Sequence, residues 1–280
     1  MLTVFRYTFA RLRGQILGWG ISVAALGLMI VGFYGIFQER QAEFQEMIEA
    51  YPPEFLAFFG GDAASILTPE GFLGMYGLSM LPVIVGIFAV IAGSGLLASD
   101  EESGRLDLIL AHPKSRSALL WGRVLGFAAA TVAILALGWL GFCLLLGQSG
   151  MGLSWGQMAL PFLSLLAQTL VYGMLALLLA LLLPARRLAA TVAGLVMAAS
   201  YFLSSLSALD DRLASAAKFL PYAYFQDSEA IHDFNPAWFA GVLGVSVALA
   251  LLAWWRFERR DIRVGGEGSW RLPRLALGKG

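Results

Sequence analysis

The chain has 280 residues, of which 59% are hydrophobic and only 14% are charged, and its mean hydropathy is +0.74. Because an average soluble domain carries about 25% charged residues, this composition excludes a large soluble domain and is typical of an integral membrane protein. The formal net charge is zero, so bulk electrostatics gives no reason to expect nucleic acid as a partner. Cys143 is the only cysteine, which excludes an intramolecular disulfide and a cysteine-based metal cluster.

The start of the chain combines three arginines with a hydrophobic stripe. Leu2, Phe5, Phe9 and Leu12 recur at helical spacing, a pattern typical of a helix that lies in the membrane interface. No small-residue cleavage site follows promptly, so we expect this segment to be retained and not removed as a signal peptide. Residues 14–37 carry no charge and exceed the roughly 20 residues that a helix needs to cross a bilayer. We therefore expect an N-terminal interfacial elbow helix, followed by the first membrane span.

The segment after the first span is mostly acidic and contains two helix signals. One is a hydrophobic stripe that predicts a short amphipathic helix on the membrane surface, formed by Phe44, Met47, Ile48 and Tyr51. The other is Thr68, Pro69 and Glu70, which supply a capping hydroxyl, a proline for the first helical position and an acidic first turn. A second span over 71–98 follows, and Pro82 inside it predicts a kink.

A charged stretch, DEESGRLDLILAHPKSR, follows the second span over 100–116, and we refer to it as the docking stretch. Leu106, Ile109 and Leu110 have the i, i+3, i+4 spacing that gives a short helix one apolar face. Pro113 should end that helix, because the residue before a proline is disfavoured in helical geometry. By spacing alone, an ordinary cytoplasmic loop is favoured over an element that docks on a partner.

Hydroxyl and basic residues mark the start of the third span, which we place over 124–146. Ser115 and Ser117 are candidate helix caps. Arg116 and Arg123 are placed to hold the helix end at the lipid headgroups. We therefore expect both arginines at the membrane surface.

Three further apolar segments predict spans over 157–183, 188–209 and 237–255, which makes six in all. All but three of the 19 lysines and arginines lie on the side that holds both chain ends and the docking stretch. The three exceptions are Arg40, Arg212 and Lys218. Because cytoplasmic loops carry an excess of Lys and Arg, we expect a multi-pass protein of the cell membrane with both termini and the docking stretch in the cytoplasm.

The sequence contains no motif for nucleotide chemistry. No G-x-x-x-x-G-K-[ST] pattern occurs, so the chain cannot hydrolyse ATP by the P-loop route. Glu229, His232 and Asp233 could lie on one helical face and bind a metal, although a solvated polar face is the commoner reason for such a trio. Gly93-Ser94-Gly95 is faintly similar to an intramembrane serine protease motif, but no histidine lies inside a span to act as its base. We therefore expect no catalytic site, no metal and no cofactor in this chain.

A few uncharged polar residues lie inside the expected spans. Gln168, Tyr172, Ser79 and Ser94 are weak candidates for a substrate pathway, whereas a buried amide such as that of Gln168 more often holds helices together. The expected span cores contain no charged residue, which argues against a proton-coupled or ion-coupled carrier. Two small-residue patterns would permit close helix contact, namely Gly14-x-x-x-Gly18 and Gly122-x-x-x-Gly126.

The docking stretch resembles the first cytoplasmic loop of the ABC-2 family of ABC transporter permeases, whose pattern reads approximately E-x-G-T-L-E-x-L-L-x-x-P-x-S-R. The matching residues, in order, are Glu102, Gly104, Leu106, Asp107, Leu108, Leu110, Pro113, Ser115 and Arg116. Arg105 departs from the pattern, because the small hydroxyl residue Thr is usual there. Further segments are similar to the family in their order along the chain: PEFLAFFGGD and LTPEGFLG before span two, FLPYAYF before span six, and FERRDI after it.

The resemblance implies an all-α integral membrane protein with six transmembrane helices, consisting of an ABC-2 type transmembrane domain over 1–263 and a cytoplasmic tail over 264–280. The docking stretch would contain a cytoplasmic coupling helix between spans two and three, which rests on a separate ATP-hydrolysing subunit. The residues implied to contact that subunit are Glu101, Glu102, Gly104, Arg105, Leu106, Asp107, Ile109, Leu110, Pro113 and Arg116.

The resemblance also implies the partners. Two ABC ATP-binding subunits would bind ATP and Mg, so this chain would not itself be an enzyme. A second permease copy, identical or related, would complete the export pathway, because family members of this size carry one half of it. We expect contact with membrane lipid and none with nucleic acid. The alternative from another class is a secondary carrier or channel that works alone.

Overall fold

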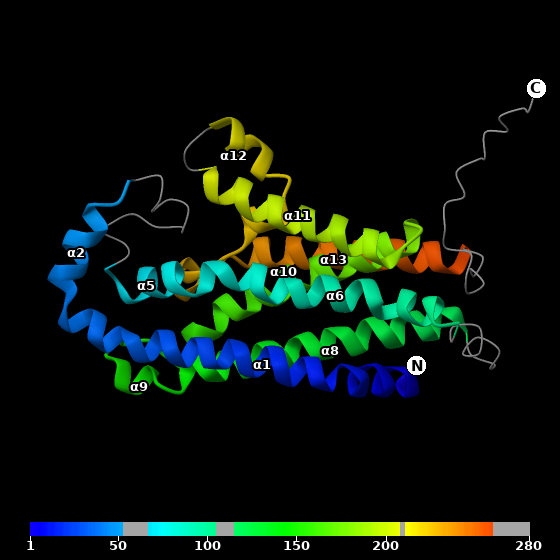
Figure 1. The fold of residues 1–280 in the computed structure, drawn as a ribbon, viewed down its shortest axis with the longest axis horizontal. Helices are drawn as coiled ribbons and strands as arrows, with labels where there is room; N and C mark the ends of the chain where they lie inside the picture. Colours follow the sequence, from blue (N-terminus) through cyan, green and yellow to red (C-terminus); the bar gives the residue numbers. More distant parts are fainter. Residues whose placement is uncertain (53–66, 105–114, 208–210, 260–280) are drawn as a thin grey trace, which may run out of the picture.

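The computed structural model describes residues 1–52, 67–104, 115–207 and 211–259, which form helices joined by turns with no strand among them. Six helical stretches are long and apolar enough to cross a membrane, and they lie side by side along one direction (Figure 1). Their bounds are Leu2–Glu39, Pro69–Glu102, Arg116–Ser149, Trp155–Leu182, Arg186–Leu206 and Pro236–Arg259. Each of the six expected spans falls on one of these stretches, which confirms the all-α integral membrane fold.

The first stretch is one continuous helix, α1 (Leu2–Glu39), with no break between the predicted elbow and the predicted span. The prediction of a separate elbow helix is therefore wrong. Val4 and Thr8, which lie outside the predicted stripe, are buried, whereas Leu2 and Phe9 of that stripe are exposed. The first turns of α1 thus pack against neighbouring spans, and the packing extends the helix to a length of about 57 Å at about 1.5 Å per residue.

Small residues on α8 (Arg116–Cys143) let α1 approach closely. A methyl group added at Gly122 or at Gly126 would lie 2.8 Å from a side-chain carbon of α1, which is too close for either helix to keep its place. The close contact predicted for this glycine pair is confirmed. The pair Gly14 and Gly18 has open space beside it, so the described part of this chain makes no such close contact there.

Span two is built from α5 (Pro69–Tyr76) and α6 (Leu81–Glu102), joined by the single 3-10 turn η1 (Leu78–Met80). Thr68 caps α5 as predicted, because its hydroxyl accepts a hydrogen bond from a backbone N–H three residues later at 3.1 Å. The predicted interruption is present, but it precedes Pro82, which lies in the first turn of α6. At that position a proline costs little, because the backbone N–H it lacks would have no partner within the helix.

The centre of the bundle is the contact between α6 and α10 (Trp155–Leu182). A methyl group added at Gly93 would overlap the carbonyl group of Gly173, so the two helix backbones touch at this point. One added at Gly173 would overlap the ring of Phe127 on α8, which closes the contact from the other side. Gly93 therefore serves helix packing, as small residues do in membrane bundles.

The two remaining long helices are α11 (Arg186–Leu206) and α13 (Pro236–Arg259). The short elements are α2 (Gln41–Glu49), α9 (Leu146–Ser149), α12 (Asp211–Ala217), η2 (Pro221–Tyr224) and η3 (Ser228–Ile231). α2 is the predicted short helix after the first span. In Figure 1 the short helices α2, α9 and α12 lie at the end of the bundle away from the N-terminus. We refer to that end as the far end and to the other as the N-terminal end.

Candidate functional site

Three of the four polar candidates for a substrate pathway meet at η2. Gln168 and Tyr172 of α10 are buried, and their side chains lie 3.1 Å apart. With its NH2 group turned toward η2, Gln168 donates to the Pro221 carbonyl at 3.2 Å, and its oxygen accepts from the Tyr222 N–H at 3.0 Å. Ser79 joins from η1, because its backbone carbonyl accepts from the Tyr222 hydroxyl at 2.7 Å. These contacts hold α10 and η1 against η2.

Ser94, the fourth candidate, lies apart from this group. Its hydroxyl donates to the Ile91 carbonyl of its own helix at 3.2 Å. Two members of the group, Tyr222 and Ser200, are not among the sequence candidates. The Ser200 hydroxyl accepts a hydrogen bond from the Tyr222 N–H at 2.9 Å. The signal for Tyr222 is the segment FLPYAYF, whose proline begins η2. Burial raises the pKa of the Tyr222 hydroxyl well above its ordinary value, so this group stays protonated and able to donate.

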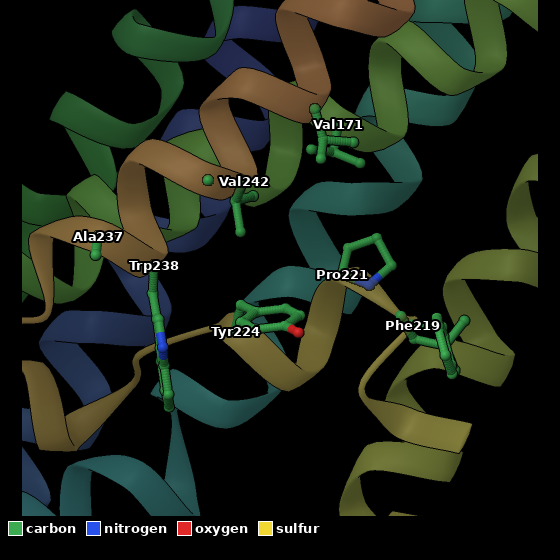
Figure 2. Close-up of a pocket in the computed structure, with 10 residues that line it drawn as sticks. Val171, Phe219, Pro221, Tyr224, Ala237, Trp238 and Val242 are labelled. Carbon is green, nitrogen blue, oxygen red and sulfur yellow. The ribbon is translucent and has the colours of Figure 1, made fainter. Parts of the chain in front are cut away.

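An apolar cavity of about 320 Å³ lies beside η2, between α10 and α13. Figure 2 shows the ring of Tyr224 in this cavity between Pro221 and Trp238. The rings of Tyr224 and Trp238 pack edge to face with their centres 5.8 Å apart, and Val171 and Val242 line the side toward the core. Such walls suit an apolar group and offer little for recognising a charged one.

The three residues considered as metal ligands do not form a site. His232 places its Nε2 atom 2.8 Å from a carboxylate oxygen of Glu70, on α5, and both side chains reach solvent. Within the described ranges, no group of three or more His, Cys, Asp or Glu side chains is placed to hold a metal ion. The contact joins η3 to the start of span two.

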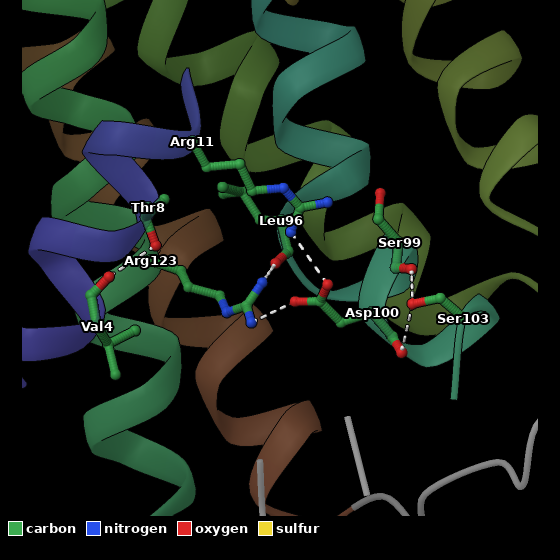
Figure 3. Close-up of polar contacts among 8 residues, drawn as sticks. All are labelled: Val4, Thr8, Arg11, Leu96, Ser99, Asp100, Ser103 and Arg123. Atoms are coloured by element: carbon green, nitrogen blue, oxygen red, sulfur yellow. Dashed lines mark hydrogen bonds and ion pairs between the residues drawn. The ribbon is translucent and has the colours of Figure 1, made fainter. Parts of the chain in front are cut away.

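At the N-terminal end, a buried carboxylate joins three spans (Figure 3). Asp100, in the last turn of α6, is only 1% exposed. One of its oxygens accepts from Arg11 of α1 at 3.0 Å, and the other accepts from Arg123 of α8. Arg123 is 3% exposed and also donates to the Leu96 carbonyl. We refer to Asp100, Arg11 and Arg123 as the Asp100 cluster.

The Asp100 cluster corrects one sequence prediction. The sequence predicts Arg123 at the lipid headgroups, and this prediction is wrong, because Arg123 is buried beside Asp100, the first residue of the docking stretch. Because α6 continues to Glu102 and α8 begins at Arg116, both residues lie within packed helices. Taking an ion out of water costs several kcal/mol, and direct pairing offsets this cost only while both partners are present. The cluster therefore links α1, α6 and α8 strongly.

The described residues of the docking stretch that follow the Asp100 cluster end at Gly104. Glu102 ends α6 and is exposed, and Gly104 has a φ of +66°, a conformation that favours glycine. Four of the ten residues implied to contact an ATPase are described, namely Glu101, Glu102, Gly104 and Arg116. The other six are Arg105, Leu106, Asp107, Ile109, Leu110 and Pro113, and they lie outside the described residues together with the predicted coupling helix.

The described part of the docking stretch resumes at Ser115, and its residues at the start of α8 contact the end of α13. Ser115 caps α8 as predicted, since its hydroxyl accepts from a backbone N–H three residues later at 3.2 Å. Ser117, the other predicted cap, instead accepts from the Trp254 indole N–H at 2.9 Å and donates to Glu258. Arg116 donates to a backbone carbonyl of α13 at 3.4 Å. Both ends of the docking stretch therefore join residues that contact other spans.

Comparison with known proteins bears on this arrangement. Residues 3–262 match the family described as ABC-2 family transporter protein, and the matched range contains nearly all of the six membrane-spanning stretches and both ends of the docking stretch. No curated protein matches the sequence. Because the family match covers most of the sequence, this multi-pass membrane chain belongs to the ABC-2 family of transporter proteins.

Proposed function

We propose that the chain is the permease subunit of an ABC exporter, which forms the substrate pathway and couples it to separate ATP-hydrolysing subunits. Membership of the ABC-2 family supports the transport role. The chain contains no P-loop, so energy from ATP has to arrive by contact with another protein. The observation that carries the proposal is the attachment of the docking stretch at both ends to contacts between spans.

The Asp100 cluster supplies a route for that energy. Asp100 lies only two residues before the end of α6, so a displacement of the docking stretch moves its carboxylate. The carboxylate holds guanidinium groups from α1 and α8, and a buried ion pair is costly to separate. A push from a partner on the docking stretch would therefore move spans one, two and three together. The contacts of Arg116 and Ser117 with α13 would extend this movement to span six.

The partners follow from the same proposal. Two ATP-binding subunits would hold ATP and Mg beneath the N-terminal end, with the docking stretch and both termini in the cytoplasm and the spans in the cell membrane. A second permease copy, identical or related, would complete the pathway. α11 and α13 are the spans least buried within this chain, which leaves apolar surface for that copy and for lipid.

The test is to assemble the permease with its ATPase and to change the charge of single residues in the docking stretch. We expect Glu102→Lys and Leu106→Asp each to lower copurification of the ATPase and transport-coupled ATP turnover about tenfold or more, because a charge introduced at a contact costs several kcal/mol. Glu46→Lys is the matched control, since Glu46 is also an exposed glutamate but lies on α2 at the far end. This variant should retain normal copurification of the ATPase and normal transport-coupled ATP turnover.

Two results would contradict the proposal. One is normal transport-coupled ATP turnover in a well-inserted Leu106→Asp variant. The other is solute flux through the chain alone in liposomes, driven by an ion gradient and indifferent to any ATPase, which would identify a stand-alone carrier.

A further inference from the structure

A second cavity, of about 160 Å³, lies beside the Asp100 cluster and differs from the one at η2 in its polar lining. It is bounded by α1, α6, α8 and the first residue of α11. The residues that decide its chemistry are Arg11, Gln15, Gly95, Ser99, Arg123 and Arg186. Its volume is about five times the ~30 Å³ that a water molecule occupies in the liquid, which is enough for a tetrahedral oxyanion.

The charges around this cavity do not balance. Arg11 and Arg123 pair with the same carboxylate, that of Asp100. Arg186 contributes a third guanidinium group and donates to the Ile91 backbone carbonyl at 3.3 Å. This group of residues thus contains three cations and one anion, which leaves an excess of two positive charges beside the partly buried cavity. Such an excess favours an anion in the cavity.

Two buried polar atoms at the cavity lack partners among the described residues: a donor on Arg123, which calls for an anion, and an acceptor on Gln15, which does so only when its amide is turned. The Nε atom of Arg123 is buried and has no hydrogen-bond partner in the part of the chain that the structure describes, and the same is true of the Oε1 atom of Gln15. An unsatisfied buried donor costs about 1–3 kcal/mol or more. An oxyanion could accept from Arg123 Nε, and the Gln15 amide could turn its NH2 group toward the same ligand.

Gly95 sets the position of the third arginine. A methyl group added there would lie 3.1 Å from a terminal nitrogen of Arg186 and 3.2 Å from its central guanidinium carbon. The guanidinium group of Arg186 therefore lies directly over the backbone of α6, where a larger residue would displace it. Arginine presents a planar fork of donors that matches phosphate oxygens.

An apolar track leads from the cavity along the membrane-spanning part of α6. Ile91 lines the cavity and is 45% exposed, and Ile87, one turn further on the same face, is 42% exposed. On α11, Leu188 follows Arg186 and is also exposed. A polar end with cationic walls followed by an apolar track matches a lipid, which has a phosphate at one end and acyl chains behind it.

We propose that this cavity binds the phosphate of an anionic membrane phospholipid between Arg11, Arg123 and Arg186, with an acyl chain along Ile91 and Ile87. The proposal does not depend on the coupling to an ATPase. It assigns a lipid site between spans one, two, three and five. The lipid would bind next to the ion pairs that join the spans, so its occupancy would affect the stability of the N-terminal end.

The test is to measure lipid retention by the purified full chain. The chain is delipidated in detergent and titrated with phosphatidylglycerol or phosphatidylcholine, and bound lipid is counted by native mass spectrometry. We expect the wild type to prefer phosphatidylglycerol, and Arg186→Gln to weaken that binding about tenfold through the loss of charge-assisted hydrogen bonds. The matched control is Arg187→Gln, because Arg187 is the exposed neighbour of Arg186 and lies outside the cavity lining. It should bind as the wild type does.

A second arm separates a lipid from a soluble anion. Inorganic phosphate at millimolar concentration should fail to displace phosphatidylglycerol, because it lacks the acyl chain that Ile91 and Ile87 would contact. Displacement by inorganic phosphate would overturn the lipid assignment, and equal lipid binding by the two glutamine variants would overturn the site. Should Arg186→Gln not fold, Arg186→Lys keeps the charge without the planar fork, and unchanged lipid affinity in that variant would count against the proposal.

Discussion

Asp100 uses each of its two carboxylate oxygens for a different helix, Arg11 on one side and Arg123 on the other. This division of contacts makes a single side chain the junction of three spans. The same end of α6 carries Glu102, which is exposed, only two residues later. Burial changes sharply here because Asp100 faces the bundle, whereas Glu102 ends the helix beyond it.

We expect Asp100→Asn to destabilise the protein by about 3–5 kcal/mol, because the change leaves the Arg123 guanidinium group buried without a counter-charge. Thermal unfolding in detergent measures this loss. The double variant Asp100→Asn/Arg123→Gln should lose less than the sum of the two single changes, since it removes both ions. Glu102→Gln is the exposed control and should have little effect, and an unfolding midpoint for Asp100→Asn equal to that of the wild type would contradict the assignment.

Gly93 is a second residue with a close neighbour, because the adjacent helix leaves no space for a side chain there. We expect Gly93→Ala to destabilise the fold by about 1–3 kcal/mol or more, because the added methyl group would overlap the Gly173 carbonyl and force the two helices apart. Gly194→Ala is the matched control on α11, since no atom lies within 4 Å of an added methyl group there. Comparison of the two unfolding midpoints tests the contact, and equal midpoints would show that α6 and α10 do not touch at Gly93.

At the scale of elements, the turn η2 joins three neighbouring elements. It forms hydrogen bonds with α10, η1 and α11, through Gln168, Ser79 and Ser200. Because η2 is too short to be stable by itself, its position depends on these hydrogen bonds. The side chains of Gln168, Tyr172 and Ser94 thus have partners within the chain, whereas Ser79 takes part only through its backbone carbonyl.

We expect Gln168→Leu to lower stability by about 1–3 kcal/mol, because it leaves the Pro221 carbonyl of η2 without its hydrogen-bond partner, while the Tyr222 N–H keeps its bond to Ser200. Ser94→Ala is the control, since the Ser94 hydroxyl bonds only to a carbonyl of its own helix, and its loss should be small. Unfolding midpoints and substrate affinity should be measured together. A Gln168→Leu protein with unchanged stability and altered substrate affinity would show that Gln168 contacts the substrate instead.

For the whole molecule, the two ends differ in chemistry. The N-terminal end contains the Asp100 cluster and both described ends of the docking stretch, and the far end contains the short elements α2 and η3. Because the spans run through the bundle in alternating directions, these two groups of residues are separated by the full length of the helices. They must therefore lie on opposite sides of a membrane.

Because of this separation, we expect single cysteines at the two ends to differ in labelling from outside the cell. In a Cys143→Ala background, Glu46→Cys and Asp233→Cys should react with an impermeant maleimide in intact cells, and Ser103→Cys should react only after the cells are opened. All three native residues are exposed, so reactivity reports the side of the membrane. The direction rests on the excess of Lys and Arg at the N-terminal end. Labelling of Ser103→Cys from outside would invert the orientation, and labelling of all three from outside would contradict the fold.

Local sequence patterns suffice to predict the number and approximate place of the spans, the caps at Thr68 and Ser115, and the family. Those features depend on local composition, because a helix needs about 20 apolar residues to cross a bilayer and a cap needs one hydroxyl. The predicted coupling helix lies outside the described residues and stays a prediction.

Only the tertiary structure decided which way each helix faces. Hydropathy does not report rotation about the helix axis when lipid and protein interior are equally apolar. Asp100 and Arg123 lie near the ends of their spans, so in the sequence they resemble surface charges. Their burial follows from the approach of α1 to α8 over Gly122 and Gly126, which brings Arg11 and Arg123 to the same carboxylate.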